Sequence, residues 1–350
     1  MYKGAIIGFG GMAQMHQQTA GNGKAENVLY TGAYDINAER NELAASKGLK
    51  AYSSAQEIFD DSEVDFVLIA TPNDYHKDYA IKALRAGKNV ICEKPVTMNR
   101  HELEEIIKVR NETGKLFTVH QNRRWDRDFV IVKKAVEDGM IGKPYYIDSR
   151  VQGSRGIPGD WRCVKEAGGG MLLDWGVHLI DQVLQLVDSP VVSVYSIMLK
   201  TRYEVDDNFK LILTFENGTT SQIQVDTNCF ISLPRWHVSG MSGTLQIDDW
   251  DCGGRIIVPS KTETVNFDEY IVVTSAGTTR TMAPRPPETM DTLPLPEVNP
   301  EWIEYYVNFA NALSGKEKLL VTAEQALRVM TVIDYTFESS DTGKVIECRI

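Results

Sequence analysis

The chain has 350 residues, 43% of them hydrophobic and 24% charged, which is typical of a globular protein and long enough for two domains. A net charge of -11 argues against nucleic acid as a partner, and no apolar run is long enough to cross a membrane. Because the first strand begins beside Met1, leaving no room for a signal peptide, and the five scattered cysteines form no CxxC pair, we expect a cytoplasmic protein with reduced thiols.

The first third of the chain alternates short apolar segments with helical patterns. The apolar segments are rich in Val, Ile and Leu, as strands buried on both faces of a parallel sheet must be. We expect strands at Gly4–Phe9, Val28–Asp35, Asp65–Ala70, Asn89–Glu93 and Phe117–Gln121. We expect helices at Gly11–Ala20, Ala38–Lys47, His76–Ala86 and Arg100–Glu112. This alternation predicts an N-terminal α/β domain over residues 1–123, built as a doubly wound parallel sheet of the Rossmann type.

The pattern changes over residues 124–350. A helix at Phe129–Glu137 precedes longer strand patterns, at Tyr145–Gln152, Val191–Thr201, Phe209–Glu216, Thr219–Asp226 and Leu245–Ile247. Asn217-Gly218 between two of these strands predicts a hairpin with a type I′ turn. A long loop is then indicated by Pro284, Pro286, Pro287, Pro294, Pro296 and Pro300, and helices follow at Glu301–Leu313 and Thr322–Phe337. Strands and helices grouped in this way predict an α+β C-terminal domain around a mainly antiparallel sheet.

A glycine-rich turn follows the first strand. It reads Gly8-Phe9-Gly10-Gly11-Met12-Ala13 and fits GxGxxA, a pattern in which glycines let backbone amides approach a pyrophosphate at a helix start. The second strand ends in Asp35, where a carboxylate accepts hydrogen bonds from a ribose 2′-hydroxyl. Together these features predict dinucleotide binding. Because Asp35 would repel a 2′-phosphate, NAD is favoured over NADP, although the nearby cation Arg40 softens that preference.

Two further motifs follow strands of the first domain. Thr71-Pro72-Asn73 and His76 come after the third expected strand, where ligands bind in such sheets. The alternative is a turn in which Asn73 or Asp74 caps the next helix. Glu93-Lys94-Pro95 closes the fourth strand. A lysine beside an acid can shuttle protons when burial lowers its pKa, whereas a solvated Glu-Lys pair would have no such part.

The most unusual segment runs from three consecutive glycines, beginning at Gly168, to His178. Glycines that lead into a helix let the backbone pass close to a ligand. Asp174 and His178 are four residues apart and therefore share one face of that helix. An imidazole titrates near neutral pH and can accept a proton from an alcohol. Two alternatives stay open: a metal-binding pair, for which no third ligand has a suggestive spacing, and a structural Asp-His hydrogen bond within the core.

Aromatic and basic residues flank this segment and the domain junction. Trp161, Arg162 and Lys165 precede the glycines, and Arg123 and Arg124 lie where the two domains meet. An aromatic face with several donors suits a sugar ring, and the cations permit a carboxylate or a phosphate on that ring. The alternative is that Arg162 and Lys165 are solvated charges on a loop.

In this order, the motifs GFGGMA, TPNDYH, EKP and GGGMLLDWGVH resemble those of the glucose-fructose oxidoreductase/inositol dehydrogenase/rhizopine catabolism (Gfo/Idh/MocA) family of oxidoreductases. The resemblance spans essentially the whole chain and includes NRRWD at residues 122–126. It implies a Rossmann domain followed by a domain with an open-faced sheet that packs against a partner's sheet. We therefore expect a homodimer or a homotetramer assembled through the C-terminal sheet.

The resemblance also implies the residues of the site. Lys94 would be the catalytic lysine, and Asp174 and His178 would contact the reacting hydroxyl. The cofactor would contact the glycine turn and Asp35, together with Thr71, Pro72, Asn73, His76, Glu93, Lys94, Asn122 and Arg124. The substrate would contact Lys94, Arg123, Trp161, Arg162, Asp174 and His178, and no metal is expected.

The activity implied by the resemblance is NAD-dependent hydride transfer from a secondary hydroxyl of a sugar, inositol or related polyol. The hydroxyl proton would pass to His178 or Lys94, while Asp174 would orient the imidazole or bind a hydroxyl. Two alternatives are a glycoside-cleaving enzyme that uses tightly bound NAD in a redox cycle and a non-catalytic regulator that senses a dinucleotide. The presence of both Lys94 and His178 argues against the regulator. A short-chain-type dehydrogenase is disfavoured because no TyrxxxLys motif is suitably placed.

Overall fold

The structure of the chain is a computed structural model that describes residues 1–21, 25, 27–260, 271–280 and 285–350. Its N-terminal part holds a parallel sheet of six strands in the order β3-β2-β1-β4-β5-β6. The strands are β1 (Tyr2–Ile7), β2 (Val28–Tyr34), β3 (Lys50–Ala51), β4 (Phe66–Ile69), β5 (Asn89–Cys92) and β6 (Phe117–Val119). The Rossmann-type sheet is therefore confirmed. Each of the five predicted strands ends one or two residues before its predicted end, and β3 is too short to leave a sequence pattern.

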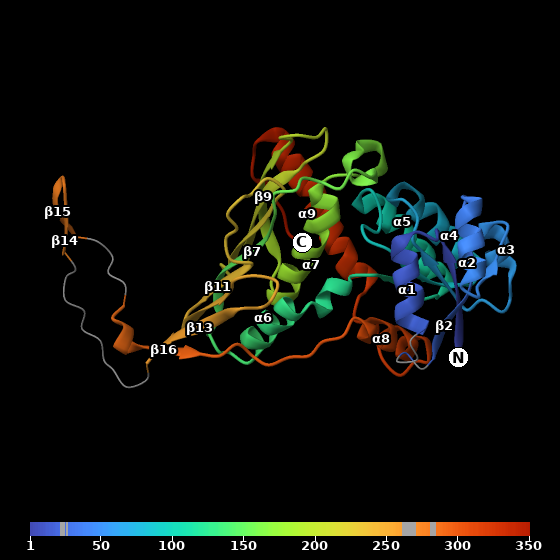
Figure 1. Cartoon of the computed structure of the whole chain (residues 1–350), viewed down its shortest axis with the longest axis horizontal. Coiled ribbons are helices and arrows are strands. Elements are labelled where there is room, and N and C mark those ends of the chain that lie inside the picture. The colour runs from blue at the N-terminus through green and yellow to red at the C-terminus, as the bar shows by residue number, and fades with distance from the viewer. Residues whose placement is uncertain (22–24, 26, 261–270, 281–284) are drawn as a thin grey trace.

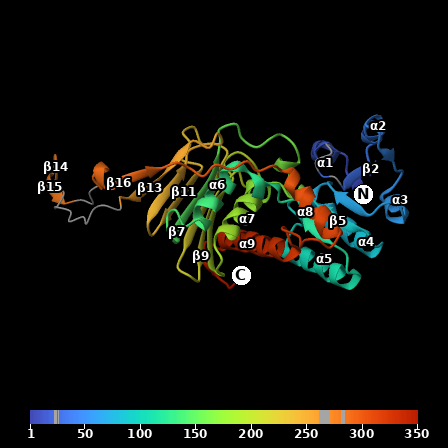
Figure 2. The ribbon, with the colours of Figure 1, turned by 90° about the horizontal axis from the view of Figure 1, so that it is seen from below.

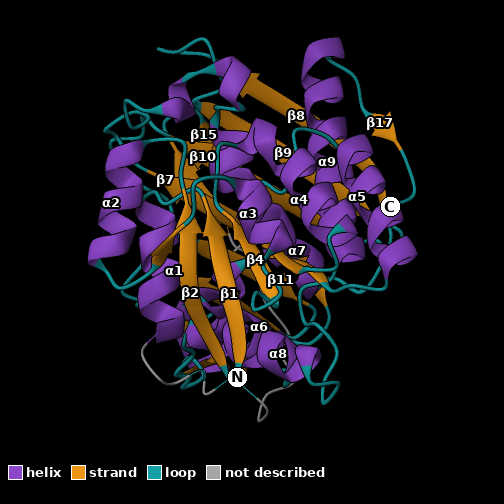
Figure 3. Ribbon diagram, turned by 90° about the vertical axis from the view of Figure 1, so that its right-hand side faces the viewer, coloured by secondary structure: helices purple, strands orange, loops and turns teal. Residues whose placement is uncertain are grey.

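Helices connect these strands and lie on both sides of the sheet (Figure 3). They are α1 (Gly11–Gly21), α2 (Ala38–Ser46), α3 (Ala55–Asp60), α4 (His76–Arg85) and α5 (Arg100–Thr113). The chain pairs β1 with β2 on one side and with β4 on the other, so the strand order reverses beside β1. In open α/β sheets, ligands bind outside the carboxyl ends of the strands at such a reversal.

A helix from late in the sequence completes the core of this part of the molecule. It is α8 (Ile303–Leu313), which packs against α1 and one face of the parallel sheet. The ring of Phe309 lies edge-on to Phe66 of β4, with 5.3 Å between centroids, and Tyr306 lies edge-on to Tyr30 of β2. The sequence pattern grouped α8 with the C-terminal domain, whereas its aromatic face is buried against the N-terminal sheet.

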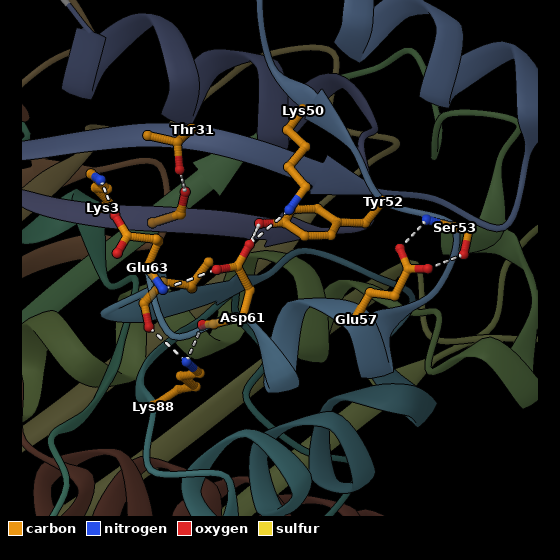
Figure 4. A network of polar contacts seen from close by, with 11 residues as sticks. Lys3, Thr31, Lys50, Tyr52, Ser53, Glu57, Asp61, Glu63 and Lys88 are labelled. Carbon is orange, nitrogen blue, oxygen red and sulfur yellow. Dashed lines mark hydrogen bonds and ion pairs between the residues drawn. The ribbon is translucent and has the colours of Figure 1, made fainter.

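Polar side chains fasten the amino-terminal edge of the parallel sheet (Figure 4). Lys88 is buried, and its Nζ donates to the carbonyl oxygens of Asp61 and Val64 at 2.6 and 2.8 Å. The Asp61 carboxylate accepts hydrogen bonds from Lys50 Nζ and the Tyr52 hydroxyl, both at 2.8 Å. Because Lys88 and the loop from Asp61 to Val64 immediately precede β5 and β4, these contacts hold the edge opposite to the ligand-binding edge.

The C-terminal part holds a sheet of nine strands in the order β16-β13-β12-β11-β7-β10-β9-β8-β17. The strands are β7 (Pro144–Gln152), β8 (Val191–Leu199), β9 (Asn208–Phe215), β10 (Thr220–Asp226), β11 (Trp236–Gly240), β12 (Gly243–Ile247), β13 (Gly254–Pro259), β16 (Met290–Leu293) and β17 (Ile346–Glu347). β7 and β10 pair in parallel, and the other neighbours pair antiparallel. This confirms the predicted, mainly antiparallel sheet. The hairpin of β14 (Ile271–Thr274) and β15 (Gly277–Arg280) forms a separate sheet.

Three helices lie between the two large sheets (Figures 1 and 2). They are α6 (Arg127–Glu137), α7 (Val177–Leu186) and α9 (Ala323–Thr342). They cover the face of the nine-stranded sheet that is turned toward the parallel sheet, and the described residues place no α-helix on the opposite face. The helix that carries His178 is therefore held at the junction of the two domains.

Two local predictions are wrong in detail. The hairpin between β9 and β10 forms, but among the described residues the only non-glycine with a positive φ is Cys252, so Asn217 does not adopt the type I′ conformation. Instead the Gly218 amide donates to the Phe215 carbonyl at 2.9 Å and Gly218 itself has φ of 85°, which is a type I turn followed by a left-handed glycine. The proline-rich segment is not one long loop, because it contains β16; Pro284 lies outside the described residues.

All five cysteines fall within the described residues and are unpaired thiols, as their spacing predicts. No helix in the described ranges is long and apolar enough to cross a membrane.

Candidate active site

The glycine turn between β1 and α1 forms a cradle at the carboxyl end of β1. Gly8 has φ of 89°, and a Cβ there would lie 2.6 Å from the carbonyl oxygen of Ala70, so the turn requires glycine. A Cβ on Gly11, the first residue of α1, would meet nothing within 4 Å. The amide of Phe9 donates to Asp35 Oδ2 at 2.7 Å. These residues fit a dinucleotide, with the amino end of α1 placed for the pyrophosphate and the Asp35 carboxylate placed for a ribose.

Asp35 and Arg40 border the same part of this cradle. The second oxygen of Asp35, Oδ1, accepts the amide of Asn37 at 2.8 Å, which fixes the carboxylate just beyond β2. Arg40 Nη1 lies 4.0 Å from Asp35 Oδ2 and 2.9 Å from the position that a Cβ on Gly10 would occupy. Two groups with opposite preferences therefore lie side by side: the Asp35 carboxylate, which favours a free ribose hydroxyl, and the Arg40 guanidinium, which attracts a 2′-phosphate.

Lys94 follows β5 and reaches the segment that leads into α7. Its Nζ donates to the Asp174 carboxylate oxygen Oδ1 at 2.8 Å and to the Asp174 carbonyl at 3.0 Å. An ammonium has three N–H donors, so two are engaged by Asp174 and a third is left. Behind Lys94, the two ring nitrogens of the buried His76 each lie 2.9 Å from a carbonyl oxygen, those of Thr71 and Pro95, and the single N–H of the neutral ring donates to one of them. His76 therefore supports the backbone on either side of the site.

Asp174 lies between two cations. Its Oδ1 contacts Lys94, and its Oδ2 lies 3.1 Å from Arg162 Nε. Burial alone would raise the pKa of the Asp174 carboxyl, but the charges and hydrogen bonds of Lys94 and Arg162 outweigh it and hold that pKa below its ordinary value. The carboxylate is thus ionised and fixes the position of the Lys94 ammonium.

His178 lies on the same side of the junction, on the first turn of α7. Its Nδ1 is 3.0 Å from Gln121 Oε1, just beyond β6, so Nδ1–H donates to that amide oxygen and Nε2 carries the lone pair. Burial, followed by the positive charges of Lys94 and Arg123, lowers the pKa of His178 well below 6.5. The imidazole is therefore neutral at neutral pH and can accept a proton at Nε2. Asp174 does not orient this imidazole as expected; Gln121 does.

The backbone before α7 is packed too tightly for side chains. A Cβ on Gly168 would lie 3.0 Å from Asn73 Nδ2, and a Cβ on Gly170 would lie 2.1 Å from Asp206 Oδ1. Asn73 Nδ2 donates to the Gly168 carbonyl at 3.4 Å, so Asn73 holds this segment rather than capping α4. The turn Leu172–Gly176 is π-helical, a form that is frequent at functional sites.

Glu93 lies at the centre of a buried polar cluster behind Lys94. His16 Nε2 and His120 Nδ1 both contact Glu93 Oε1, at 2.6 and 2.8 Å, and the amide of Lys94 donates to Oε2 at 3.0 Å. His16 Nδ1 bonds the Tyr306 hydroxyl. Burial alone would raise the pKa of Glu93, but His120 and His16 hold it well below its ordinary value, whereas burial and His120 lower the pKa of His16 to about 4. One atom from each of Glu93, His16 and His120 lies within 4.8 Å of the others, a metal-like grouping whose donors and acceptors already satisfy one another.

The sequence could not single out Gln121, His16 or His120, because His16 lies about 100 residues before the other two and none of the three belongs to a spaced motif. With the structure known, the position of two of them can be explained. Gln121 and His120 directly follow β6, where ligand-edge residues are expected in this type of sheet. His16 lies on α1, three residues after the glycine turn ends.

The structure separates the predicted residues of the domain junction. Arg124 is paired with both carboxylate oxygens of Asp181, at 2.6 and 2.7 Å, so it joins Asn122–Trp125 to α7. Arg123 instead lies over the ring of Trp175, 4.2 Å from its centroid, close enough to influence His178.

The remaining predicted residues lie either near Asp174 or in the turns that follow β4 and β6. Arg162 lies over the ring of Trp161, 4.6 Å from its centroid, and brings that ring toward Asp174. Asn122 is buried at the start of its short helical turn, and Thr71 and Pro72 form the turn after β4.

Comparison with known proteins agrees with this architecture. Residues 2–121 match a model described as an oxidoreductase family with an NAD-binding Rossmann fold, and residues 129–246 match the GFO/IDH/MocA C-terminal domain. A solved NAD-binding protein from Listeria innocua is 46% identical, with a TM-score of 0.92 over 99% of both chains. The scyllo-inositol 2-dehydrogenase (NADP(+)) IolW of Bacillus subtilis is 27% identical over 83% of this chain and 81% of its own. An uncharacterized oxidoreductase of Schizosaccharomyces pombe, C26H5.09c, is 33% identical over 51% of this chain and 49% of its own.

Proposed function

The chain belongs to the GFO/IDH/MocA family of oxidoreductases with an NAD-binding Rossmann fold, and we propose that it transfers a hydride between a secondary hydroxyl of a sugar, inositol or related polyol and the nicotinamide. The observation that carries this proposal is the meeting of Lys94, Asp174 and a neutral His178 at the ligand-binding edge of the parallel sheet. The name of IolW, an inositol dehydrogenase, supports a cyclic polyol as the substrate class.

In this proposal the protein supplies proton transfer and charge stabilisation. The nicotinamide, when bound, accepts the hydride from the reacting carbon. His178 Nε2 takes the hydroxyl proton, because Nδ1–H is committed to Gln121 and the lone pair lies on Nε2. The third N–H of Lys94 stabilises negative charge on the same oxygen, and Asp174 holds that ammonium in place. Positioned acid-base groups of this kind contribute about 10²–10⁴-fold to a rate.

A substrate panel tests the proposal. Inositols, hexoses, hexose phosphates, uronates and glycosides are each incubated with NAD and with NADP while the absorbance of the reduced cofactor is followed. We expect at least one cyclic polyol or sugar to give a steady rise. Consumption of a glycoside without accumulation of reduced cofactor would instead indicate glycosidic cleavage with tightly bound NAD. Binding of the dinucleotide with no turnover of any compound would indicate a regulator.

The charge of Asp35 decides cofactor preference in this proposal. Asp35→Asn keeps the size and an acceptor for the Phe9 amide but removes the negative charge beside Arg40. We expect the ratio of kcat/KM for NADP to that for NAD to rise by about tenfold or more, which corresponds to roughly 1.4 kcal/mol. Arg40→Ala is the matched control and should move the ratio the other way. An unchanged ratio in Asp35→Asn would separate Asp35 from the ribose.

We further propose that the uncovered face of the nine-stranded sheet joins two copies of the chain. Ile197, Leu199 and Ile212 are large apolar side chains on the neighbouring strands β8 and β9, each 41–51% exposed. Light scattering should give a dimer or a tetramer, and Ile212→Glu should lower the mass toward that of the monomer. Ile36→Glu, at a residue 93% exposed on the N-terminal domain, should leave the assembly intact. A monomeric wild type would contradict the proposal.

A further inference from the structure

A cavity with a volume of about 510 Å³ lies beside the candidate site. Its walls come from the turn after β6, the start of α6, the turn between β12 and β13, and the segment before α8. Three indole rings line it, those of Trp125, Trp250 and Trp302, and we call it the tryptophan pocket. Its volume falls within the range of about 300–1,000 Å³ that is usual for small-molecule sites.

The tryptophan pocket is one side chain away from the proposed base. Trp175 contacts His178 edge-on, with 6.2 Å between ring centroids. The same ring lies 5.7 Å from the ring of Trp250, and the guanidinium of Arg123, another lining residue, stacks on it at 4.2 Å. A molecule whose reacting hydroxyl lies at His178 therefore has a second, aromatic-lined space next to it.

Two ion pairs lie in or directly behind the wall of the pocket. Asp126 accepts hydrogen bonds from Arg123 at 2.9 Å and from the Trp302 indole N–H at 3.2 Å. Asp128 is paired with Arg235 at 3.1 Å. Each lining carboxylate thus faces a guanidinium, and Arg127 adds a further cation to the lining, so the pocket offers both donors and acceptors to a polar ligand. Apolar ring faces combined with both donors and acceptors match a hydroxylated ring, whose C–H face packs on indoles while its hydroxyls exchange hydrogen bonds.

We propose that the tryptophan pocket binds a second sugar ring, joined to the ring whose hydroxyl reacts at His178. The substrate is then a disaccharide or a glycoside of a cyclic polyol rather than a single ring. This inference rests on the proposed function for the identity of the reacting ring. The pocket itself supplies affinity and specificity, and no chemical step takes place in it.

Calorimetric titration tests the pocket directly in the presence of NAD. The single-ring probes are glucose, galactose and myo-inositol, and the two-ring probes are maltose, cellobiose, lactose, melibiose and trehalose. We expect at least one two-ring probe to bind about tenfold more tightly than its component rings, the advantage that one well-packed aromatic contact provides. That ratio should approach one in Trp250→Ala and in Trp302→Ala and should be partly restored in Trp250→Phe. Phe230→Ala, which removes a ring 77% exposed outside the pocket, should keep it.

Two results would overturn the proposal: no two-ring probe binds more tightly than its components, or the advantage survives in both alanine variants. Circular dichroism of each variant establishes that the fold is retained, and the ratio of the two affinities cancels any general loss of binding. Incubating the preferred probe with NAD then separates the two proposals. Pocket-dependent binding without reduced cofactor would keep the pocket and reject the hydride transfer, whereas reduction of NAD with no two-ring preference would reject the pocket alone.

Discussion

Lys94→Ala is expected to lower kcat by about 10²–10⁴-fold while leaving the affinity for NAD nearly unchanged. The loss follows from removing the ammonium whose third donor stabilises the oxygen from which the proton departs. The fold should survive, because Asp174 keeps its ion pair with Arg162 and is not left as an unpaired buried charge. Steady-state kinetics measure kcat, and calorimetric titration with NAD measures the affinity.

The matched control for this variant is Lys133→Ala, which removes a half-exposed lysine of α6 whose ammonium pairs with Glu137 on the same helix. It should behave as the wild type in both measurements. If Lys94→Ala keeps most of its turnover, Lys94 is not part of the chemistry. If it loses NAD affinity and turnover in parallel, Lys94 serves the cofactor and the proton transfer must be assigned elsewhere.

His178→Asn is expected to cause a loss of similar size, since the asparagine amide cannot accept a proton. In the wild type, the pKa of His178 is held well below 6.5 by burial and by the charge of Lys94. The imidazole therefore stays neutral through neutral pH, and kcat/KM should fall only as the pH drops well below 6.5 and protonation removes the lone pair. The pH profile of kcat/KM checks this direction.

The pH profile of the Lys94→Ala variant links the two residues. Removing the positive charge of Lys94 relieves one of the effects that lower the pKa of His178, so the acid limb of the residual activity should move up toward 6.5. Gln121→Ala removes the acceptor of the His178 Nδ1–H. This variant should lower kcat without moving the acid limb of the pH profile up toward 6.5. An acid limb above 6.5 in the wild type would show that the titrating base is another group.

The parallel strands were predictable because strands buried on both faces leave uninterrupted apolar runs, as in Phe66–Ile69, where all four residues are buried. Strand β11 was not predictable. Trp236–Gly240 mixes an indole, an imidazole, a hydroxyl and a glycine, and it shows neither the two-residue alternation of a half-buried strand nor an uninterrupted apolar run. The return of α8 to the N-terminal sheet was equally hidden. Its apolar face indicates that it packs on something, but the sequence does not say on which sheet.

Among the site residues, the sequence motifs identified Lys94, Asp174 and His178, which lie close together in the structure. The motifs did not predict which side chains these three residues contact. Their spacing places Asp174 and His178 on one helical face. In the structure the turn is π-helical, and residues of the neighbouring domain contact both side chains: Lys94 binds the Asp174 carboxylate, and Gln121 accepts from the His178 imidazole. Such pairings depend on how two domains are placed, which no local pattern records.

The most direct test of the central claim is a structure of the chain with NAD bound. The account predicts that the ribose lies against Asp35 and that C4 of the nicotinamide faces the space between Lys94 Nζ and His178 Nε2, leaving room there for one hydroxylated carbon. A nicotinamide ring that lies outside this space, with Lys94 and His178 remote from C4, would contradict the assignment of both residues.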